Sequence, residues 1–160
     1  MTTKLNSMRL LERHHIPYLV CTYTYDPDDP PDAAEVARRI GHTPQEVFKT
    51  LVVTAGGASR PLLIMLAADR QLDLKRAAAA IGQKRLELMP RHETERLTGL
   101  KVGGIGALAL SAKPWPSYLD RGAEGLTQIF VNAGQRGVML GLAVADLQRV
   151  LNATWIDAAI

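Results

Sequence analysis

The fold is decided by Val47-Phe48-Lys49-Thr50-Leu51-Val52-Val53, a stretch whose β-branched and aliphatic residues predict a β-strand. Side chains of a strand alternate between its two faces, so Lys49 points the same way as Val47 and Leu51. An ammonium group among apolar neighbours loses hydration and needs an anion or a strong dipole nearby. Two interpretations follow. Lys49 either awaits a substrate that compensates its charge, or protects an edge strand from sheet-to-sheet pairing.

Helices and strands are both predicted on either side of this stretch. Apolar spacing, together with start signals at Asp32 and Asp73 and stop signals at Gly41 and Gly82, predicts five helices. Asp32 and Glu35 have the spacing of a capping box. The order of elements lacks a regular βαβ alternation, which indicates an α+β fold. The expected helices are 5–14, 32–40, 74–81, 90–98 and 143–151, and the expected strands are 18–24, 47–53, 61–68, 86–88, 128–133 and 138–142.

Length and composition favour one soluble domain spanning residues 1–160. Hydrophobic residues make up 47% of the 160 positions and charged residues 22%, which is ordinary for a globular protein. No apolar run approaches the length of a membrane span, and the N-terminus lacks a secretory signal. We therefore expect a cytoplasmic protein with no membrane partner. Cys21 is the single cysteine, and we expect it to pack in the core. Neither a metal site nor a cofactor is predicted.

Charge is unevenly distributed along the chain, although the net charge is only +3. Residues 26–35 carry acidic side chains and no basic one. Residues 75–101 are rich in basic side chains, which favours contact with a phosphate backbone but is also typical of solvated helix faces. The basic residues of this region are Lys75, Arg76, Lys84, Arg85, Arg91, Arg96 and Lys101, against Glu87, Glu93 and Glu95.

A glycine-rich stretch, Val102-Gly103-Gly104-Ile105-Gly106, is the second candidate for chemistry. Glycine lets a substrate approach the main chain closely, and exposed N–H groups could stabilise a developing oxyanion. A bulge or a turn is the alternative interpretation. Gly134-Gln135-Arg136-Gly137 is typical of a hairpin turn. The sequence contains neither a serine elbow, a P-loop nor a zinc-protease motif.

Several segments together resemble the YbaK family of aminoacyl-tRNA deacylases, which is related to the editing domain of bacterial prolyl-tRNA synthetase. They occur in the family order over nearly the full chain. The resemblance implies a mixed, mostly antiparallel or barrel-like sheet flanked by helices. The free-standing branch that clears Cys-tRNA(Pro) is favoured by residues 71–75. The matching segments are Thr22-Tyr23 with Asp26-Pro27, Val47 to Leu51, Gln71-Leu72-Asp73-Leu74-Lys75, Thr98-Gly99 through Val102 to Ile105, and Arg136-Gly137.

Roles for individual residues follow from this resemblance. Lys49 is expected to bind the aminoacyl end of the tRNA near its ester, and the Gly103-Gly104 backbone to stabilise the oxyanion. The substrate's own thiol or water would attack, so no protein nucleophile is required. Prolyl-tRNA synthetase is an expected partner and DNA is not. The expected substrate-binding residues are Tyr23, Thr50, Ile105, Arg136 and Gly137, and the expected tRNA contacts are Lys75, Arg76, Lys84 and Arg85.

The chain departs from the family pattern at two places. The glycine stretch continues Ile105-Gly106-Ala107 where Ile-Ser-Pro is usual, and Met139 stands where an aspartate is common. Both changes make the expected pocket less polar. Two alternatives therefore stand beside Cys-tRNA(Pro). One is deacylation of another small aminoacyl-tRNA, carrying alanine or serine, and the other is a tRNA-binding module without catalytic activity.

Overall fold

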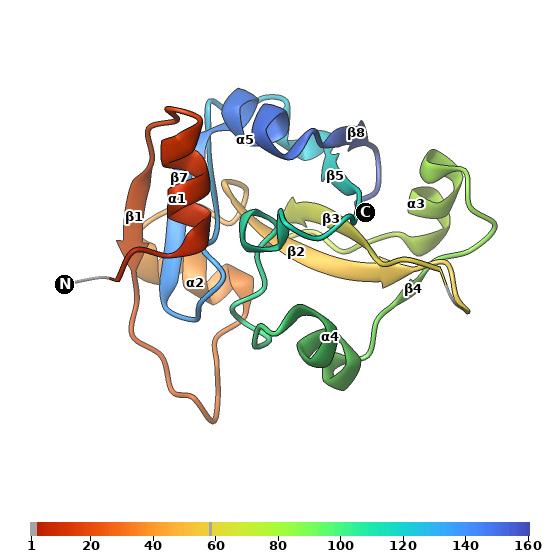
Figure 1. Cartoon of the computed structure of the whole chain (residues 1–160), viewed down its shortest axis with the longest axis horizontal. Helices are drawn as coiled ribbons and strands as arrows, with labels where there is room; N and C mark the ends of the chain where they lie inside the picture. Colours follow the sequence, from red (N-terminus) through yellow and green to blue (C-terminus); the bar gives the residue numbers. More distant parts are fainter. Residues whose placement is uncertain (1–2, 58) are drawn as a thin grey trace.

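The computed structural model describes residues 3–57 and 59–160, and its described part contains one mixed sheet flanked by helices (Figure 1). The helices are α1 (Asn6–Arg13), α2 (Ala33–Ile40), α3 (Leu74–Ile81), α4 (Arg91–Thr98) and α5 (Val144–Leu151), with short 3₁₀ turns at Leu108–Leu110 and Arg121–Ala123. The strands are β1 (Leu19–Thr22), β2 (Val47–Thr54), β3 (Leu62–Ala67), β4 (Glu87–Leu88), β5 (Ser117–Asp120), β6 (Gln128–Asn132), β7 (Val138–Ala143) and β8 (Thr154–Ile156).

The strands follow the order β1-β7-β6-β2-β3-β5-β8, and β4 pairs with β2 off this path. Neighbours close in sequence pair antiparallel, as β2 does with β3 and β6 with β7, whereas β2–β6, β3–β5 and β5–β8 are parallel. The prediction of a single α+β domain with a mixed sheet is confirmed. The predicted helices and strands are present, with ends that differ by two residues at most, whereas β5 and β8 were not predicted.

β2 is a central strand, so the interpretation of Lys49 as an edge-strand lysine is wrong. One side of β2 pairs with β3 from Phe48 to Val53. The other side pairs with β6 at Val47 and Phe48, and with β4 only at Val53 and Thr54. No described strand pairs with residues 49–52 on this second side. The sheet is therefore open next to Lys49, although β2 has partners on both sides.

Local signals fixed the ends of α2 largely as expected. The Asp32 side chain accepts a hydrogen bond from the Glu35 N–H at 2.8 Å, and Gly41 ends the helix at φ +79°. The full capping box is not formed, because the Glu35 carboxylate pairs with Arg38 and Arg39 instead of returning to the helix start. Those two ion pairs hold the pKa of Glu35 down at about 2. The same kind of cap, from Asp73, begins α3.

Apolar clusters on the two faces of the sheet hold the helices in place. α1 and α5 pack with Phe48 and Leu63 in the larger cluster, and α2 packs with Val47 and Phe130 on the other face. α3 packs against β3 through Ala77 and Ala78. In Figure 1, α4 lies below β2, and the loop before α2 lies at the lower left of the molecule. Among the described residues, no helix has the length and apolar character needed to cross a bilayer.

Candidate functional site

A cavity of about 690 Å³ opens beside the unpaired stretch of β2. β2 contributes Lys49 and Thr50 to its wall, the glycine stretch contributes Gly103 and Ile105, and Tyr23 closes another side. These five predicted site residues are thus brought together from three separate parts of the chain. The volume falls within the range of about 300–1,000 Å³ that small-molecule sites occupy.

The open edge of β2 turns main-chain groups toward this cavity. Val47 accepts a hydrogen bond from Ala68 next to β3, whereas Glu46 accepts one from Phe130 on the β6 side. Because strand residues alternate, the N–H and C=O of Thr50 face the β6 side, where no described strand pairs with them. Thr50 lines the cavity, so its peptide groups are available to a bound molecule.

Lys49 is half-buried and anchored at one point. Its Nζ donates a hydrogen bond to the main-chain oxygen of Arg70 at 2.7 Å. Burial lowers the pKa of Lys49 from its ordinary value, and the negative charges of Asp32 and Asp69 work against that shift. An ammonium group has three donors, so two N–H groups of Lys49 are left for other partners. The Arg70 carbonyl dipole and the carboxylates of Asp32 and Asp69 therefore offset part of the hydration that the Lys49 ammonium loses.

The glycine stretch is clamped to the β6–β7 hairpin by two side chains. Asn132 Nδ2 donates to the Gly103 oxygen at 2.9 Å, and Arg136 Nε donates to the Val102 oxygen at 2.7 Å. Asn132 Oδ1 also accepts from the N–H of Gly134 at 2.7 Å, so one amide ties the loop and the hairpin turn together. The loop has little room, because a Cβ on Gly104 would lie 2.8 Å from the Arg136 nitrogen of the main chain.

The main-chain donors of this loop differ from those that we expected. The Gly104 N–H donates to the Lys101 oxygen at 2.7 Å, and Gly104 is not on the cavity wall. No partner for the N–H groups of Gly103 and Ile105 is found among the described residues, and both residues line the cavity. Gly103 has φ +94°, a left-handed conformation that favours glycine. The available donor pair is therefore Gly103 with Ile105, in place of Gly103 with Gly104.

Two further predicted residues lie behind the wall. Gly137 is buried, accepts a hydrogen bond from the Tyr23 N–H at 3.0 Å, and has φ +89°. A Cβ there would lie 3.2 Å from the Tyr23 oxygen, so this glycine allows Tyr23 to reach the cavity. Arg136 likewise does not line the cavity but holds the glycine loop. The structure places both as supports for residues that line it.

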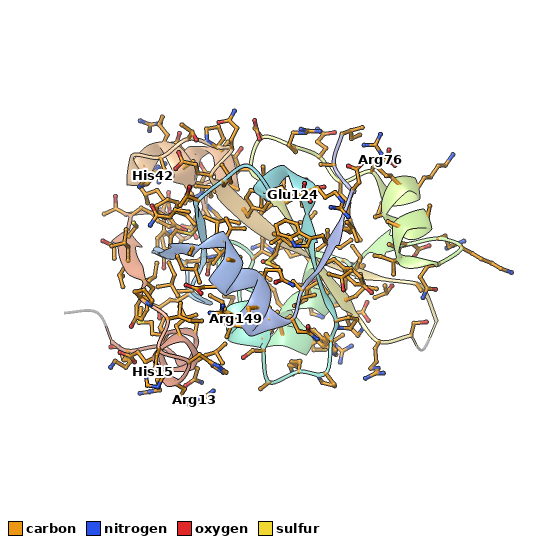
Figure 2. The ribbon with its side chains drawn as sticks, turned by 90° about the horizontal axis from the view of Figure 1, so that it is seen from above. Arg13, His15, His42, Arg76, Glu124 and Arg149 are labelled. Carbon is orange, nitrogen blue, oxygen red and sulfur yellow. The ribbon has the colours of Figure 1, made fainter. Side chains whose placement is uncertain are left out.

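The basic residues that we expected to contact tRNA lie away from the cavity. None of Lys75, Arg76, Lys84 and Arg85 is on its wall. Figure 2 shows Arg76 on α3, near one end of the molecule, where its guanidinium donates to the Ala159 oxygen at 2.8 Å. Arg85 pairs with Glu87. Cys21 packs beside an apolar cluster, and burial raises the pKa of its thiol, which disfavours a nucleophilic thiolate.

Other cavity residues escaped the sequence analysis. The loop before α2 contributes Asp28 and Asp29, and β6 contributes Asn132. Met89, which directly follows β4, and Arg91, at the start of α4, are also on the wall. Arg91 was visible only as one of many basic residues, and Asn132 only as a member of the predicted strand 128–133. Within residues 3–57 and 59–160, no group of three or more His, Cys, Asp or Glu side chains is arranged to hold a metal ion.

The family model of the aminoacyl-tRNA editing domain matches residues 29–150, which include most of the cavity wall. The chain belongs to the aminoacyl-tRNA editing domain family. Its general activity is therefore the editing of aminoacyl-tRNA by deacylation, and its substrate class is aminoacyl-tRNA.

Two curated relatives are similar over most of their lengths. The "Putative Cys-tRNA(Pro)/Cys-tRNA(Cys) deacylase EbsC" of Enterococcus faecalis is 32% identical over 154 residues, covering 96% of this chain and 92% of that protein. The uncharacterized protein YwhH of Bacillus subtilis is 27% identical over 124 residues, which is 77% of each chain.

Solved structures match the editing-domain fold. The crystal structure of "a putative trans-editing enzyme for prolyl tRNA synthetase" has a TM-score of 0.78 at 21% identity, covering 99% of both chains. The hypothetical protein APE2540 has a TM-score of 0.82 at 20% identity, covering 95% of this chain and 97% of that one.

The clamp predicts that Asn132→Ala loosens the glycine loop. Loss of the bond to the Gly103 oxygen removes about 1 kcal/mol of net stabilisation, and loss of the bonds to the hairpin turn adds to this. Hydrogen exchange at the Val102 and Gly104 amides is expected to become at least about fivefold faster. Exchange by mass spectrometry or NMR measures this. Asn6→Ala, at an exposed position at the start of α1, is the control, and equal exchange in both variants contradicts the clamp.

Proposed function

We propose that this protein is a trans-editing enzyme that removes a mischarged amino acid from tRNA, with Cys-tRNA(Pro) as its preferred substrate. The observation that carries the proposal is that Lys49, Gly103 and Ile105 line one cavity and that the N–H groups of the two loop residues have no partner among the described residues. Similarity to the relative whose printed name specifies Cys-tRNA(Pro) and Cys-tRNA(Cys) supports the choice of cysteine. Docking beside prolyl-tRNA synthetase forms part of the same proposal.

Lys49 orients the terminal ribose and its ester. The ammonium group keeps its bond to the Arg70 oxygen and offers its remaining N–H groups to the substrate. Because the side chain is half-buried, its charge is screened less than a surface charge would be. A positive charge at this place stabilises the alkoxide that leaves when the ester bond breaks.

The loop amides stabilise the tetrahedral intermediate. As the nucleophile attacks the ester carbonyl, negative charge develops on the carbonyl oxygen. The Gly103 and Ile105 N–H groups are rigidly held by the clamp and so require little reorganisation. Removal of one such donor typically costs about 10²- to 10³-fold in rate.

The nucleophile comes from outside the protein. With a cysteinyl ester, the substrate sulfur bonds to the carbonyl carbon while the carbon–oxygen ester bond breaks. The products are a four-membered thiolactone and the free hydroxyl of the terminal ribose, which takes up the proton that the thiol gave up. With other amino acids water attacks and a free amino acid leaves. Neither route uses Cys21, which is off the cavity wall.

A substrate panel tests the function directly. Purified protein is incubated with Cys-tRNA(Pro), Ala-tRNA(Pro) and Ser-tRNA, and the remaining aminoacyl-tRNA is measured against a protein-free control. We expect the cysteinyl ester to be cleaved fastest. Faster cleavage of the alanyl or seryl ester moves the specificity to that amino acid, and binding of tRNA without any cleavage identifies a non-catalytic module.

Replacement of Lys49 by Met is expected to lower kcat/KM by about 10²- to 10³-fold, since one stabilising contact to the transition state is lost. The fold should persist, because Met preserves the apolar stem. The pKa of Lys49 is lowered in the folded state, so its charge costs stability below that pKa, and the cost is relieved as pH rises. The free energy of unfolding at pH 7 should therefore stay within about 1 kcal/mol of wild type. Wild-type turnover in Lys49→Met would disprove the assignment.

The lowered pKa of Lys49 also predicts a pH signature. As pH rises, Lys49 loses its proton earlier than an ordinary lysine with a pKa of about 10.4, whereas an arginine at this position stays charged. The ratio of wild-type to Lys49→Arg deacylation rates should therefore fall with rising pH. Titration of a substrate thiol affects both enzymes equally and cancels in the ratio. A ratio that stays constant as the pH rises to the pKa of an ordinary lysine would count against a catalytic charge on Lys49.

A further inference from the structure

Arg91 lines one rim of the cavity beside the carboxylate of Glu95, and the charges of Lys101 and Arg136 act on the same carboxylate. Arg91 Nε lies 3.8 Å from Glu95 Oε2, and the same oxygen accepts the Val102 N–H at 2.8 Å. Arg136 donates to the oxygen of that same Val102, so it joins the group through the glycine loop. The Val102 N–H bond holds the pKa of Glu95 low, and the charges of Arg91, Lys101 and Arg136 lower it further.

This rim keeps a positive excess. The charges of Arg91, Lys101 and Arg136 all act on Glu95, so this group holds three positive charges against one carboxylate. The other charged pair on α4 cancels itself, because Arg96 NH2 lies 4.0 Å from Glu93 Oε1. Arg91 lines the cavity, yet most of its side chain is exposed, and Lys101 is exposed at the start of the glycine loop. Both cations can therefore reach a ligand that extends out of the cavity.

The opposite rim has the opposite sign. Asp28, Asp29 and Asp32 line the cavity from the loop before α2, and residues 26–35 contain no basic side chain. In Figure 1 this loop lies to the left of α4, below β2. A polyanion is repelled by the acidic rim and attracted to the α4 rim. The cavity thus has a defined side from which a nucleic acid can enter.

We propose that Arg91, Lys101 and Arg136 bind the phosphodiester backbone next to the 3′-terminal nucleotide of the aminoacyl-tRNA. This inference rests on the proposed function and gives the substrate a direction. The terminal ribose reaches Lys49, and the preceding nucleotides leave over α4 and the glycine loop. The basic residues on and after α3 do not contribute, because no hydrogen bond or ion pair among the described residues links them to Glu95 or the glycine loop. Arg76 is engaged with Asp157 and Ala159, and Arg85 is paired with Glu87.

The test compares three double variants that each remove two positive charges. Arg91→Gln with Lys101→Gln changes the proposed site, and Arg136 is left intact because it also holds the loop. Lys75→Gln with Lys84→Gln changes the α3 side. Arg13→Gln with Lys113→Gln is the matched control, since Arg13 lies on exposed α1 (Figure 2) and neither residue lines the cavity. Melting temperatures confirm that each variant is folded.

Binding is measured with uncharged tRNA over a range of KCl concentrations. For the Arg91/Lys101 variant we expect Kd to rise about tenfold or more, and the slope of log K against log salt to shrink by about 1.4, which is 0.7 for each lost phosphate contact. The control should keep both values. Equal weakening in the control, or weakening only in the α3-side variant, overturns the proposal. This measurement needs no catalysis, so it holds even if the wild type cleaves no substrate.

A cleavage assay distinguishes a role in phosphate binding from a role at the ester. Cysteinyl-adenosine carries the ester and the terminal ribose but lacks the neighbouring phosphodiester. The Arg91/Lys101 variant should lose at least about ten times more kcat/KM on Cys-tRNA(Pro) than on cysteinyl-adenosine. Equal losses on the two substrates would mean that these residues act at the ester, and would overturn the proposal. The Lys49→Met variant is the contrast, because it should lose activity on both.

Discussion

The site depends on the way β2 pairs along one of its sides, with β6 at its start and with β4 at its end. Between them, no described strand pairs with residues 49–51 on that side, and the Val52 oxygen accepts a hydrogen bond from the Met89 N–H. A gap in the middle of a sheet would normally cost hydrogen bonds. Here it places Lys49 and the Thr50 peptide on the wall of a cavity while the remainder of β2 stays fixed to β3. A central strand supplies rigidity that an edge strand or a loop would lack.

The glycine loop obtains its shape from its neighbours. Glu95 holds the Val102 N–H, and Asn132 and Arg136 hold two successive carbonyl oxygens. With these groups fixed, the remaining N–H groups of Gly103 and Ile105 are directed without help from a substrate. The same arrangement places Arg136 and Arg91 on the rim, so loop geometry and rim charge share their residues. The free-energy effects of substitutions at these residues are therefore expected to be coupled, so the effect of a double variant will differ from the sum of the two single variants.

Much of the fold followed from the sequence, because its signals were local. Asp32 and Asp73 marked helix starts, and the apolar run of β3 predicted a central strand in which all six residues are buried. The cavity was predictable only through Lys49 and the family pattern. The basic rim of the cavity was not predictable, because Arg91 and Arg85 carry the same charge in the sequence. Only the position of α4 in the fold places Arg91 on the cavity wall and leaves Arg85 away from it. Gly104 takes part in a local turn, in which its N–H bonds to the Lys101 oxygen, as the alternative interpretation of the glycine stretch allowed.

The departures at positions 106 and 139 are linked through Asn132. A Cβ on Gly106 would lie 2.3 Å from the Asn132 oxygen, so the family's usual serine could not fit unless the main chain shifted. Met139 lines the cavity beside the same asparagine, with its sulfur 3.8 Å from Nδ2. Polar contacts in this part of the cavity therefore come from the Asn132 amide and the main chain, not from a hydroxyl or a carboxylate. Such a wall discriminates between small side chains by shape, at about 1–3 kcal/mol per methylene, which favours a route in which the substrate thiol itself provides the selectivity.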